Sequence, residues 1–274
     1  MSPAFPTAAY LRRIGLSEQT GPPTLELLAE LQLAHLVAVP FENLHVYHRR
    51  SPRTGVDWSV PKIVEQSRGG WCFELNGAFA ALLRAVGFTA DHVACRVWEG
   101  SSTNPVPGGW GPEFDHLATV VHLAGERWFV DVGFGDCCVQ PLPLADHEQA
   151  AVPRAARMEA RGDAFVLHEL MPSEAATAVP ATWAPQLHID PTPRALPEFD
   201  GRCRQLQDDS TSMWHQKPFA TRALDGSGSR VTLRSGVLRV RTGAGPFVDQ
   251  PVASTEEWDA RLAEWFNLED SALR

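Results

Sequence analysis

The sequence predicts an α+β protein built from three successive parts, at residues 1–88, 89–196 and 197–274. In the first part, apolar residues recur at the spacing of helices packed on a core. In the second, apolar residues alternate with polar ones or form short β-branched and aromatic runs, which is typical of strands. The third combines a hairpin pattern with an amphipathic helix. We therefore expect a helical N-terminal unit, a strand-rich middle and a mixed C-terminal unit.

Two helices are indicated in the first part. Thr24 is a suitable N-cap for a helix whose leucines follow at helical spacing until Pro40 ends it. A second helix is predicted from Cys72 to about residue 86, with Gly87 as the residue that terminates it. A short helix near residues 10–14 precedes both.

The middle part contains three strand patterns, at residues 90–98, 115–123 and 127–134. Residues 141–160 and 171–197 are rich in proline and alanine, and we expect them to be irregular connections.

In the third part, residues 229–241 predict a hairpin around Ser235-Gly236. Residues 254–266 predict a closing helix, with Ser254 as its N-cap and Glu257 three residues later.

Composition and charge exclude several classes of protein. The chain has 274 residues, 44% of them apolar, but no apolar run of about 18 residues that could cross a membrane. A net charge of −9 without a Lys- or Arg-rich run argues against a nucleic-acid partner. The first twenty residues lack the apolar region of a secretory signal. We expect a cytoplasmic protein with reduced thiols and no membrane contact; the oligomeric state is left open.

The cysteines are few, odd in number and irregularly spaced, which argues against a disulfide framework and against a zinc site of the CxxC type. They are Cys72, Cys95, Cys137, Cys138 and Cys203. We expect no metal, and a structural role for the adjacent pair Cys137-Cys138.

Cys72 stands apart because it opens a predicted helix. Unpaired N–H groups and the helix dipole stabilise negative charge there, which favours a thiolate. The preceding Gly69-Gly70 pair lets the backbone turn into the helix without a Cβ clash. The alternative is that Cys72 is a small apolar packing residue.

A base and an orienting carboxylate could come from the hairpin predicted at residues 115–136. A two-residue loop at Ala124-Gly125 leaves His116 diagonal to Asp131, whereas a four-residue loop at 122–125 opposes them directly. Either loop keeps both side chains on one face of the hairpin. An odd-length loop or a bulge would separate them.

His122 lies on the same face of an unbulged strand as His116, so spacing does not choose between the two histidines. Asp131 could instead be a turn residue, and either histidine could be an ordinary core side chain. Together with Cys72, these groups would form a nucleophile, a base and an orienting acid.

At these positions the sequence resembles the arylamine N-acetyltransferase family. The matching pieces are YLRRIG at 10–15, AVPFENL at 38–44, RGGWCFELN at 68–76, DHL at 115–117 and DVGFG at 131–135. The resemblance implies an N-terminal helical bundle, a β-barrel-like middle domain and a C-terminal α/β lid, with a cysteine-protease-like core. It also implies Cys72 as nucleophile, His116 as base and Asp131 as orienting acid.

The resemblance further implies a two-step reaction, in which acetyl-CoA as co-substrate acetylates Cys72 and an aromatic amine or hydrazine then takes the acetyl group. The implied acceptor-pocket residues are Phe41, Val97 and Phe134, and the implied coenzyme contacts are Trp98, Gly133, Gly135 and Trp214.

Three other functions stay open. An amide synthase of the same fold would transfer a thioester-bound biosynthetic chain and use the same three residues. A thiol protease or transglutaminase-like enzyme shares the nucleophile chemistry. A non-catalytic binding module could retain an old active site.

Overall fold

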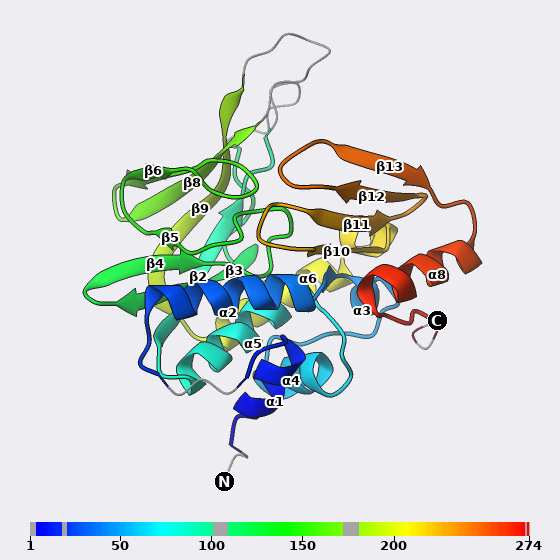
Figure 1. The fold of residues 1–274 in the computed structure, drawn as a ribbon, viewed down its shortest axis with the longest axis horizontal. Helices are drawn as coiled ribbons and strands as arrows, with labels where there is room; N and C mark the ends of the chain where they lie inside the picture. The colour runs from blue at the N-terminus through cyan, green and yellow to red at the C-terminus, as the bar shows by residue number, and fades with distance from the viewer. Residues whose placement is uncertain (1–3, 18–20, 101–108, 172–180, 272, 274) are drawn as a thin grey trace.

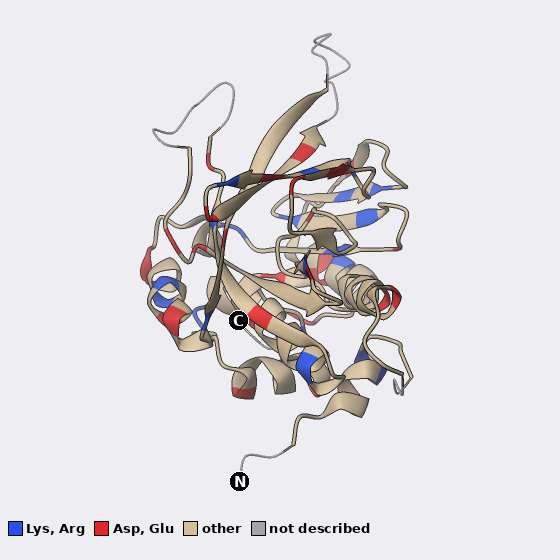
Figure 2. Cartoon of the chain, turned by 90° about the vertical axis from the view of Figure 1, so that its left-hand side faces the viewer, with Lys and Arg blue, Asp and Glu red and all other residues tan. Residues whose placement is uncertain are grey.

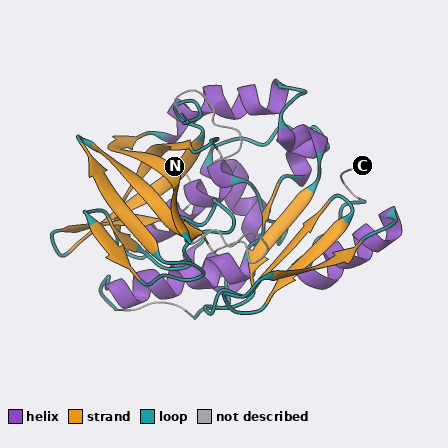
Figure 3. Ribbon diagram, turned by 90° about the horizontal axis from the view of Figure 1, so that it is seen from above, coloured by secondary structure: helices purple, strands orange, loops and turns teal. Residues whose placement is uncertain are grey.

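The computed structural model describes residues 4–17, 21–100, 109–171, 181–271 and 273. Helices of the N-terminal part lie beneath two separate sheets, one on each side of the molecule (Figures 1 and 3). The helices of this part are α1 (Thr7–Arg13), α2 (Leu25–Ala38), α3 (Leu44–Tyr47), α4 (Val56–Val64) and α5 (Cys72–Ala85). Together they confirm the α+β class and the helical N-terminal unit.

The predicted helix ends are confirmed. The Thr24 hydroxyl accepts a hydrogen bond from the Leu27 N–H at 3.2 Å and so caps α2. Gly87 has a φ of +102°, which favours glycine, and the N–H groups of Gly87 and Phe88 donate to carbonyls of the last turn of α5. The sequence analysis predicted neither α3 nor α4.

The middle of the chain forms an eight-stranded antiparallel sheet that curves into an almost closed barrel. Its order is β5-β4-β3-β2-β9-β8-β7-β6. The strands are β2 (Thr89–Val97), β3 (His116–Leu123), β4 (Glu126–Val130), β5 (Leu142–Pro143), β6 (His147–Gln149), β7 (Ala156–Arg161), β8 (Ala164–Met171) and β9 (Thr182–Arg194).

The hairpin of β3 and β4 has the two-residue loop. Leu123 pairs with Glu126, and both loop residues, Ala124 and Gly125, have positive φ, as a tight hairpin turn requires. Of the two loops considered from the sequence, the one at residues 124–125 is therefore correct.

The expectation that residues 141–160 and 171–197 are irregular is wrong for most of their length, since β5, β6, β7 and β9 lie there; residues 172–180 are outside the described ranges. Proline suggested a break because it cannot donate to a ladder. The β9 prolines lie at two interruptions of the pairing: one register shift falls next to Pro185, and the other spans residues 191–193. At a bulge one residue of the strand is left unpaired, so the N–H group that proline lacks is not needed there.

The C-terminal part forms a second, five-stranded antiparallel sheet with the order β1-β10-β11-β12-β13. Its edge strand β1 (Phe41–Glu42) comes from the helical part of the chain and pairs with β10. The remaining elements are η1 (Leu196–Phe199), α6 (Asp200–Asp208), α7 (Met213–Gln216), β10 (Phe219–Ala223), β11 (Arg230–Arg234), β12 (Val237–Arg241), β13 (Phe247–Pro251) and α8 (Thr255–Phe266).

Both C-terminal predictions are confirmed. β11 and β12 pair as a hairpin across Ser235-Gly236. Ser254 caps α8 by accepting from the Glu257 N–H at 3.2 Å, and the Glu257 carboxylate accepts from the Ala253 N–H at 2.9 Å. The division of the chain at residues 88 and 196 stays a prediction.

The charge distribution fits the expectation from composition. Acidic and basic residues are interspersed along the ribbon (Figure 2). A helix that crosses a membrane must be long and apolar. None of the helices in the described ranges is long and apolar enough.

A buried ionic group lies between α4 and α5. The Lys62 ammonium donates to both oxygens of Glu74, at 2.9 and 3.0 Å, and lies 3.7 Å from a carboxylate oxygen of Glu42. All three residues are at most 2% exposed. Glu74 also accepts from the Trp58 indole and from the Trp71 N–H, so the group holds the entry to α5 in place.

Replacing Lys62 with methionine should cost about 3–5 kcal/mol of unfolding free energy at neutral pH, because it removes the cation bonded to the buried Glu74 and leaves Glu42 with the more distant Arg68. Urea unfolding of the full chain measures this loss. The matched control is Arg239→Met, which removes an exposed partner of Asp249 and should cost less than about 1 kcal/mol. If both variants lost the same unfolding free energy, burial would not explain the contribution of Lys62 to stability.

Candidate active site

Cys72 is the first residue of α5 and is 5% exposed. The two glycines before it are needed for close packing: a Cβ on Gly69 would lie 2.0 Å from the Pro40 carbonyl oxygen, and one on Gly70 would lie 2.6 Å from a carboxylate oxygen of Glu74. The predicted position of the cysteine at a helix start is confirmed. Its backbone lies where helix N–H groups lack partners within the helix.

His116 and Asp131 meet beside this helix start. His116 is the first residue of β3, and Asp131 directly follows β4. The His116 Nε2 and Asp131 Oδ2 atoms are 2.6 Å apart, and the side chain of each is 3% exposed. The Cys72 side chain interacts with the same imidazole and contributes to its raised pKa. The structure thus brings the three predicted residues together.

The electrostatics of His116 follow from these contacts. Burial alone would lower its pKa, but the charge and hydrogen bond of Asp131, with a smaller contribution from Cys72, raise the pKa from 6.5 to about 10. The ring is therefore a buried imidazolium at neutral pH. An imidazolium beside a cysteine favours the thiolate.

His122, the histidine that spacing left as an alternative, has a different environment. Its Nε2 lies 2.9 Å from Asp91 Oδ2, and both side chains are well exposed, at 43% and 33%. His122 is thus a surface residue near the opposite end of β3.

Asn76 is a residue of this site that the sequence analysis did not single out. Its Nδ2 donates to Asp131 Oδ1 at 2.9 Å and to the Leu117 carbonyl at 2.6 Å, and its Oδ1 accepts from the Val132 N–H at 3.0 Å. It lies one turn after Cys72 on α5. That spacing puts both side chains on one helix face and could have indicated Asn76 as a partner.

Gly133 makes the close approach of the two segments possible. A Cβ there would lie 2.8 Å from Cys72 Cα and 2.8 Å from Asn76 Nδ2. Its N–H donates to Asp131 Oδ1 at 2.8 Å. Packing within the protein therefore explains why residue 133 is a glycine, independently of any contact with the coenzyme.

Aromatic residues surround the three polar groups. The Phe134 ring packs edge-on against His116, with centroids 5.2 Å apart. Phe41 contacts Trp214 at 5.9 Å, and Trp214 also contacts Trp71, the residue before Cys72, at 6.0 Å. Phe41, Phe134 and Trp214 therefore lie around the site, from three different parts of the chain.

The other predicted contacts lie on the barrel and in the loop after β4. Val97 ends β2 and packs, like Phe134, on the core of the barrel. Gly135 has a φ of +97°, and a Cβ there would come within 3.9 Å of Phe41. The ring of Trp98 packs against Trp110, with centroids 5.0 Å apart.

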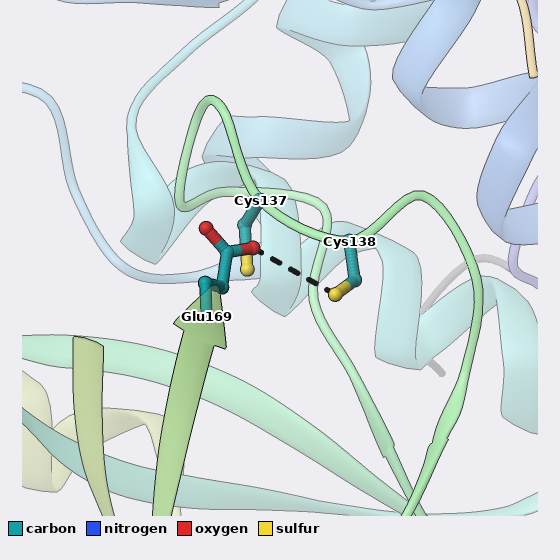
Figure 4. A group of neighbouring side chains, drawn as sticks. All are labelled: Cys137, Cys138 and Glu169. Atoms are coloured by element: carbon teal, nitrogen blue, oxygen red, sulfur yellow. Dashed lines mark hydrogen bonds between the residues drawn. The ribbon is translucent and has the colours of Figure 1, made fainter. Parts of the chain in front are cut away.

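One group in the described ranges has the residue types of a metal site. Cys137, Cys138 and Glu169 place their ligand atoms within 4.8 Å of one another (Figure 4). All five cysteines are free and buried, as expected for reduced thiols.

Comparison with known proteins agrees with this geometry. The sequence matches the protein family described as N-acetyltransferase over residues 24–272. The chain belongs to the arylamine N-acetyltransferase family. The resemblance inferred from the motifs is thereby confirmed.

Two curated relatives of this family member are 34% identical to it over part of its length. Proansamycin X synthase from Amycolatopsis mediterranei aligns over 146 residues, which are 52% of this chain and 53% of that protein. Arylamine N-acetyltransferase / N-hydroxyarylamine O-acetyltransferase from Salmonella typhimurium aligns over 161 residues, which are 58% of this chain and 55% of that protein. The chain thus spans about half the length of these curated relatives.

The fold is similar over nearly the whole chain. The solved structure of arylamine N-acetyltransferase from Salmonella typhimurium has a TM-score of 0.84 and 26% identity, covering 98% of this chain and 92% of that one. The cysteine-protease-like arrangement of helical bundle and barrel predicted for the family member is confirmed at the level of the fold.

Gly133→Ala should destabilise the protein by about 1–3 kcal/mol, because the added methyl group overlaps the start of α5. Chemical unfolding measures the loss. Gly201→Ala is the matched control: a Cβ there meets no atom within 4 Å, and its helical backbone tolerates alanine. If the two variants were equally stable, the contact between Gly133 and α5 could not be tight.

Asp131→Asn should destabilise the protein most at low pH. The pKa of His116 is raised in the folded state, so the stability it contributes is complete below its unfolded value of about 6.5 and is lost as the pH rises through about 10. The difference in unfolding free energy between wild type and variant should therefore shrink across that interval.

The control is Asp91→Asn, which removes the exposed partner of His122 and should leave stability nearly unchanged at every pH. A difference between wild type and Asp131→Asn that stays constant from pH 6.5 to 10 would contradict a buried imidazolium.

Proposed function

We propose that the protein is an arylamine N-acetyltransferase that moves an acetyl group from acetyl-CoA to an aromatic amine or hydrazine through an acetyl-cysteine intermediate. The observation that carries the proposal is the buried contact of 2.6 Å between His116 and Asp131 beside the helix-opening Cys72. Membership of the family and the full-length likeness to the Salmonella typhimurium structure support it.

In the first half-reaction, the Cys72 sulfur attacks the carbonyl carbon of the acetyl thioester. The tetrahedral intermediate then expels the coenzyme thiolate, which takes a proton from the His116 imidazolium, and Cys72 keeps the acetyl group. Exchange of one thioester for another is nearly balanced in energy, so little driving force is needed.

In the second half-reaction, the nitrogen of the acceptor amine attacks the acetyl carbon. His116, now neutral, takes the amine proton, and the Cys72 thiolate leaves and restores the ion pair. The product is the acetylated amine. Splitting the transfer into two steps lets one site bind donor and acceptor in turn.

Asp131 is assigned the orienting role. It accepts the His116 ring N–H and keeps the other nitrogen directed at the sulfur. Asn76 and the Gly133 N–H hold the second carboxylate oxygen, so the acid does not rotate away. The Cys72 N–H, at the first position of α5, is suited to stabilise the oxyanion of both tetrahedral intermediates.

The acceptor and donor contacts belong to the same proposal. Phe41 and Phe134, with Val97 behind Phe134, would bind the flat ring of the acceptor. Gly135 and Trp214 lie where the five-stranded sheet of the C-terminal part meets the site, and they would contact the coenzyme arm. Gly133 and Trp98 are weaker candidates for contact with the coenzyme, because packing against neighbouring residues already explains their positions.

The second candidate function is an amide synthase acting on a thioester-bound biosynthetic chain. The observation that favours it is the 34% identity to proansamycin X synthase over 146 residues. Both functions need the same three residues and differ in the acyl donor. Donor preference therefore separates them.

Brief exposure to acetyl-CoA followed by intact-protein mass spectrometry should show one added acetyl group. Cys72→Ser should lose it, because a hydroxyl beside an imidazole ionises far less readily than a thiol. The control Cys203→Ser removes another buried thiol and should keep the added mass.

Release of free coenzyme A thiol with a hydrazine or an aniline then tests turnover. No turnover, with Cys72 present and reactive to iodoacetamide, would favour the amide synthase. A protein that neither gains the acetyl mass nor reacts at Cys72 would fit a binding module, and digestion of casein would indicate a protease.

A further inference from the structure

A second group of reactive side chains lies outside the triad, at Cys137, Cys138 and Glu169. We propose that these three residues bind one thiophilic divalent metal ion of the zinc class. Their ligand atoms, two sulfurs and one carboxylate oxygen, all lie within 4.8 Å of one another. Figure 4 shows them converging from two separate segments of the chain.

The two segments are held together by the fold. Cys137 and Cys138 lie in the loop that follows Asp131, and Glu169 is near the end of β8. The three side chains are buried, with the two cysteines 6% and 5% exposed and Glu169 1% exposed. A buried site on two packed segments fixes ligand positions before the metal binds, which favours affinity. The mechanism proposed above uses none of the three.

The carboxylate is already oriented toward the thiols. Arg154 Nε donates to Glu169 Oε2 at 2.8 Å, and the same guanidinium donates to Asp136 Oδ2 at 3.0 Å. The other oxygen, Oε1, accepts from the Cys138 thiol at an S–O distance of 3.7 Å. Arg154 thus has the position of an outer residue that fixes a metal-binding carboxylate and leaves one oxygen for the ion.

Charge supports a divalent ion. Metal binding replaces the two thiol protons, so two thiols and one M²⁺ give a dithiolate complex and two released protons. Two thiolates and one carboxylate carry three negative charges, which the metal ion and the Arg154 guanidinium, shared with Asp136, offset in this buried site. Two sulfurs and one oxygen form a ligand set typical of zinc, and a fourth, external ligand would complete a tetrahedron.

This assignment differs from the structural role expected for the cysteine pair from sequence. The CxxC spacing of common zinc sites is absent, and the third ligand is about thirty residues further along the chain. A bound ion would fix the loop that carries Asp131, Phe134 and Gly135 to the wall of the barrel. Binding of the ion does not depend on which acyl donor the enzyme uses.

Cadmium is a suitable probe, because its bonds to thiolates absorb in the ultraviolet. The titration uses the full chain carrying Cys72→Ser, so that the nucleophile does not bind the probe. We expect one equivalent of Cd²⁺ to produce the thiolate band, and excess Zn²⁺ to remove it. We also expect Zn²⁺ to raise the melting temperature in a concentration-dependent way.

Added to this background, Cys137→Ser or Cys138→Ser should abolish the band. Glu169→Gln should keep a weaker site, with affinity lowered by roughly 10-fold or more. The matched controls are Cys95→Ser and Cys203→Ser, which remove other buried thiols and should leave the titration unchanged. Circular dichroism checks that each variant is folded.

The proposal is overturned if the Cys72→Ser protein gives no band, or if the band survives in either Cys137→Ser or Cys138→Ser. It is also overturned if Glu169→Gln binds Cd²⁺ as tightly as its parent. The readout is independent of acetyl transfer, so failure of this proposal and failure of the proposed function are distinguishable.

Discussion

The close packing of the start of α5 on the segment after β4 determines the rest of the site. This packing brings Cys72 from the helical part next to Gly133 and the segment that carries Asp131, which pairs with His116. Gly133 allows the two backbones to approach. Asn76 makes two hydrogen bonds to the segment after β4, at Asp131 and Val132, and a third to Leu117 in β3. Because Asn76 holds Asp131 and Asp131 holds His116, the position of His116 depends on the helix that carries Cys72.

The surrounding structure holds this contact from both sides. On the side of the helices, the buried Lys62–Glu74 pair fixes the turn that leads into Cys72. On the side of the barrel, Asp136 pairs with Arg154 and also with Arg230 and Arg241 of the facing sheet. The loop after Asp131 is thereby connected to both sheets.

Sequence patterns predicted the elements whose own residues carry the signal. The apolar spacing and end residues of α2 and α5 were enough, as were the hairpins at residues 116–130 and 230–241. Predictions were wrong or missing where tertiary context dominates. The strand β9 tolerates prolines at its bulges, and α4 buries Lys62 because Glu74 and Glu42 lie opposite it. Neither partner is adjacent in sequence, so no local pattern could reveal them.

By itself, the sequence determined the chemical groups of the site: a cysteine opening a helix, a histidine and an aspartate on one hairpin, and motifs of the acetyltransferase family. Spacing could not choose between His116 and His122, since both occupy one face of the same strand; the resemblance to the family favoured His116. The tertiary structure places His116 2.6 Å from Asp131 and pairs His122 with Asp91 at the exposed end of the strand. It also brought Glu169 to Cys137 and Cys138, since contacts between distant segments depend on how the whole barrel folds.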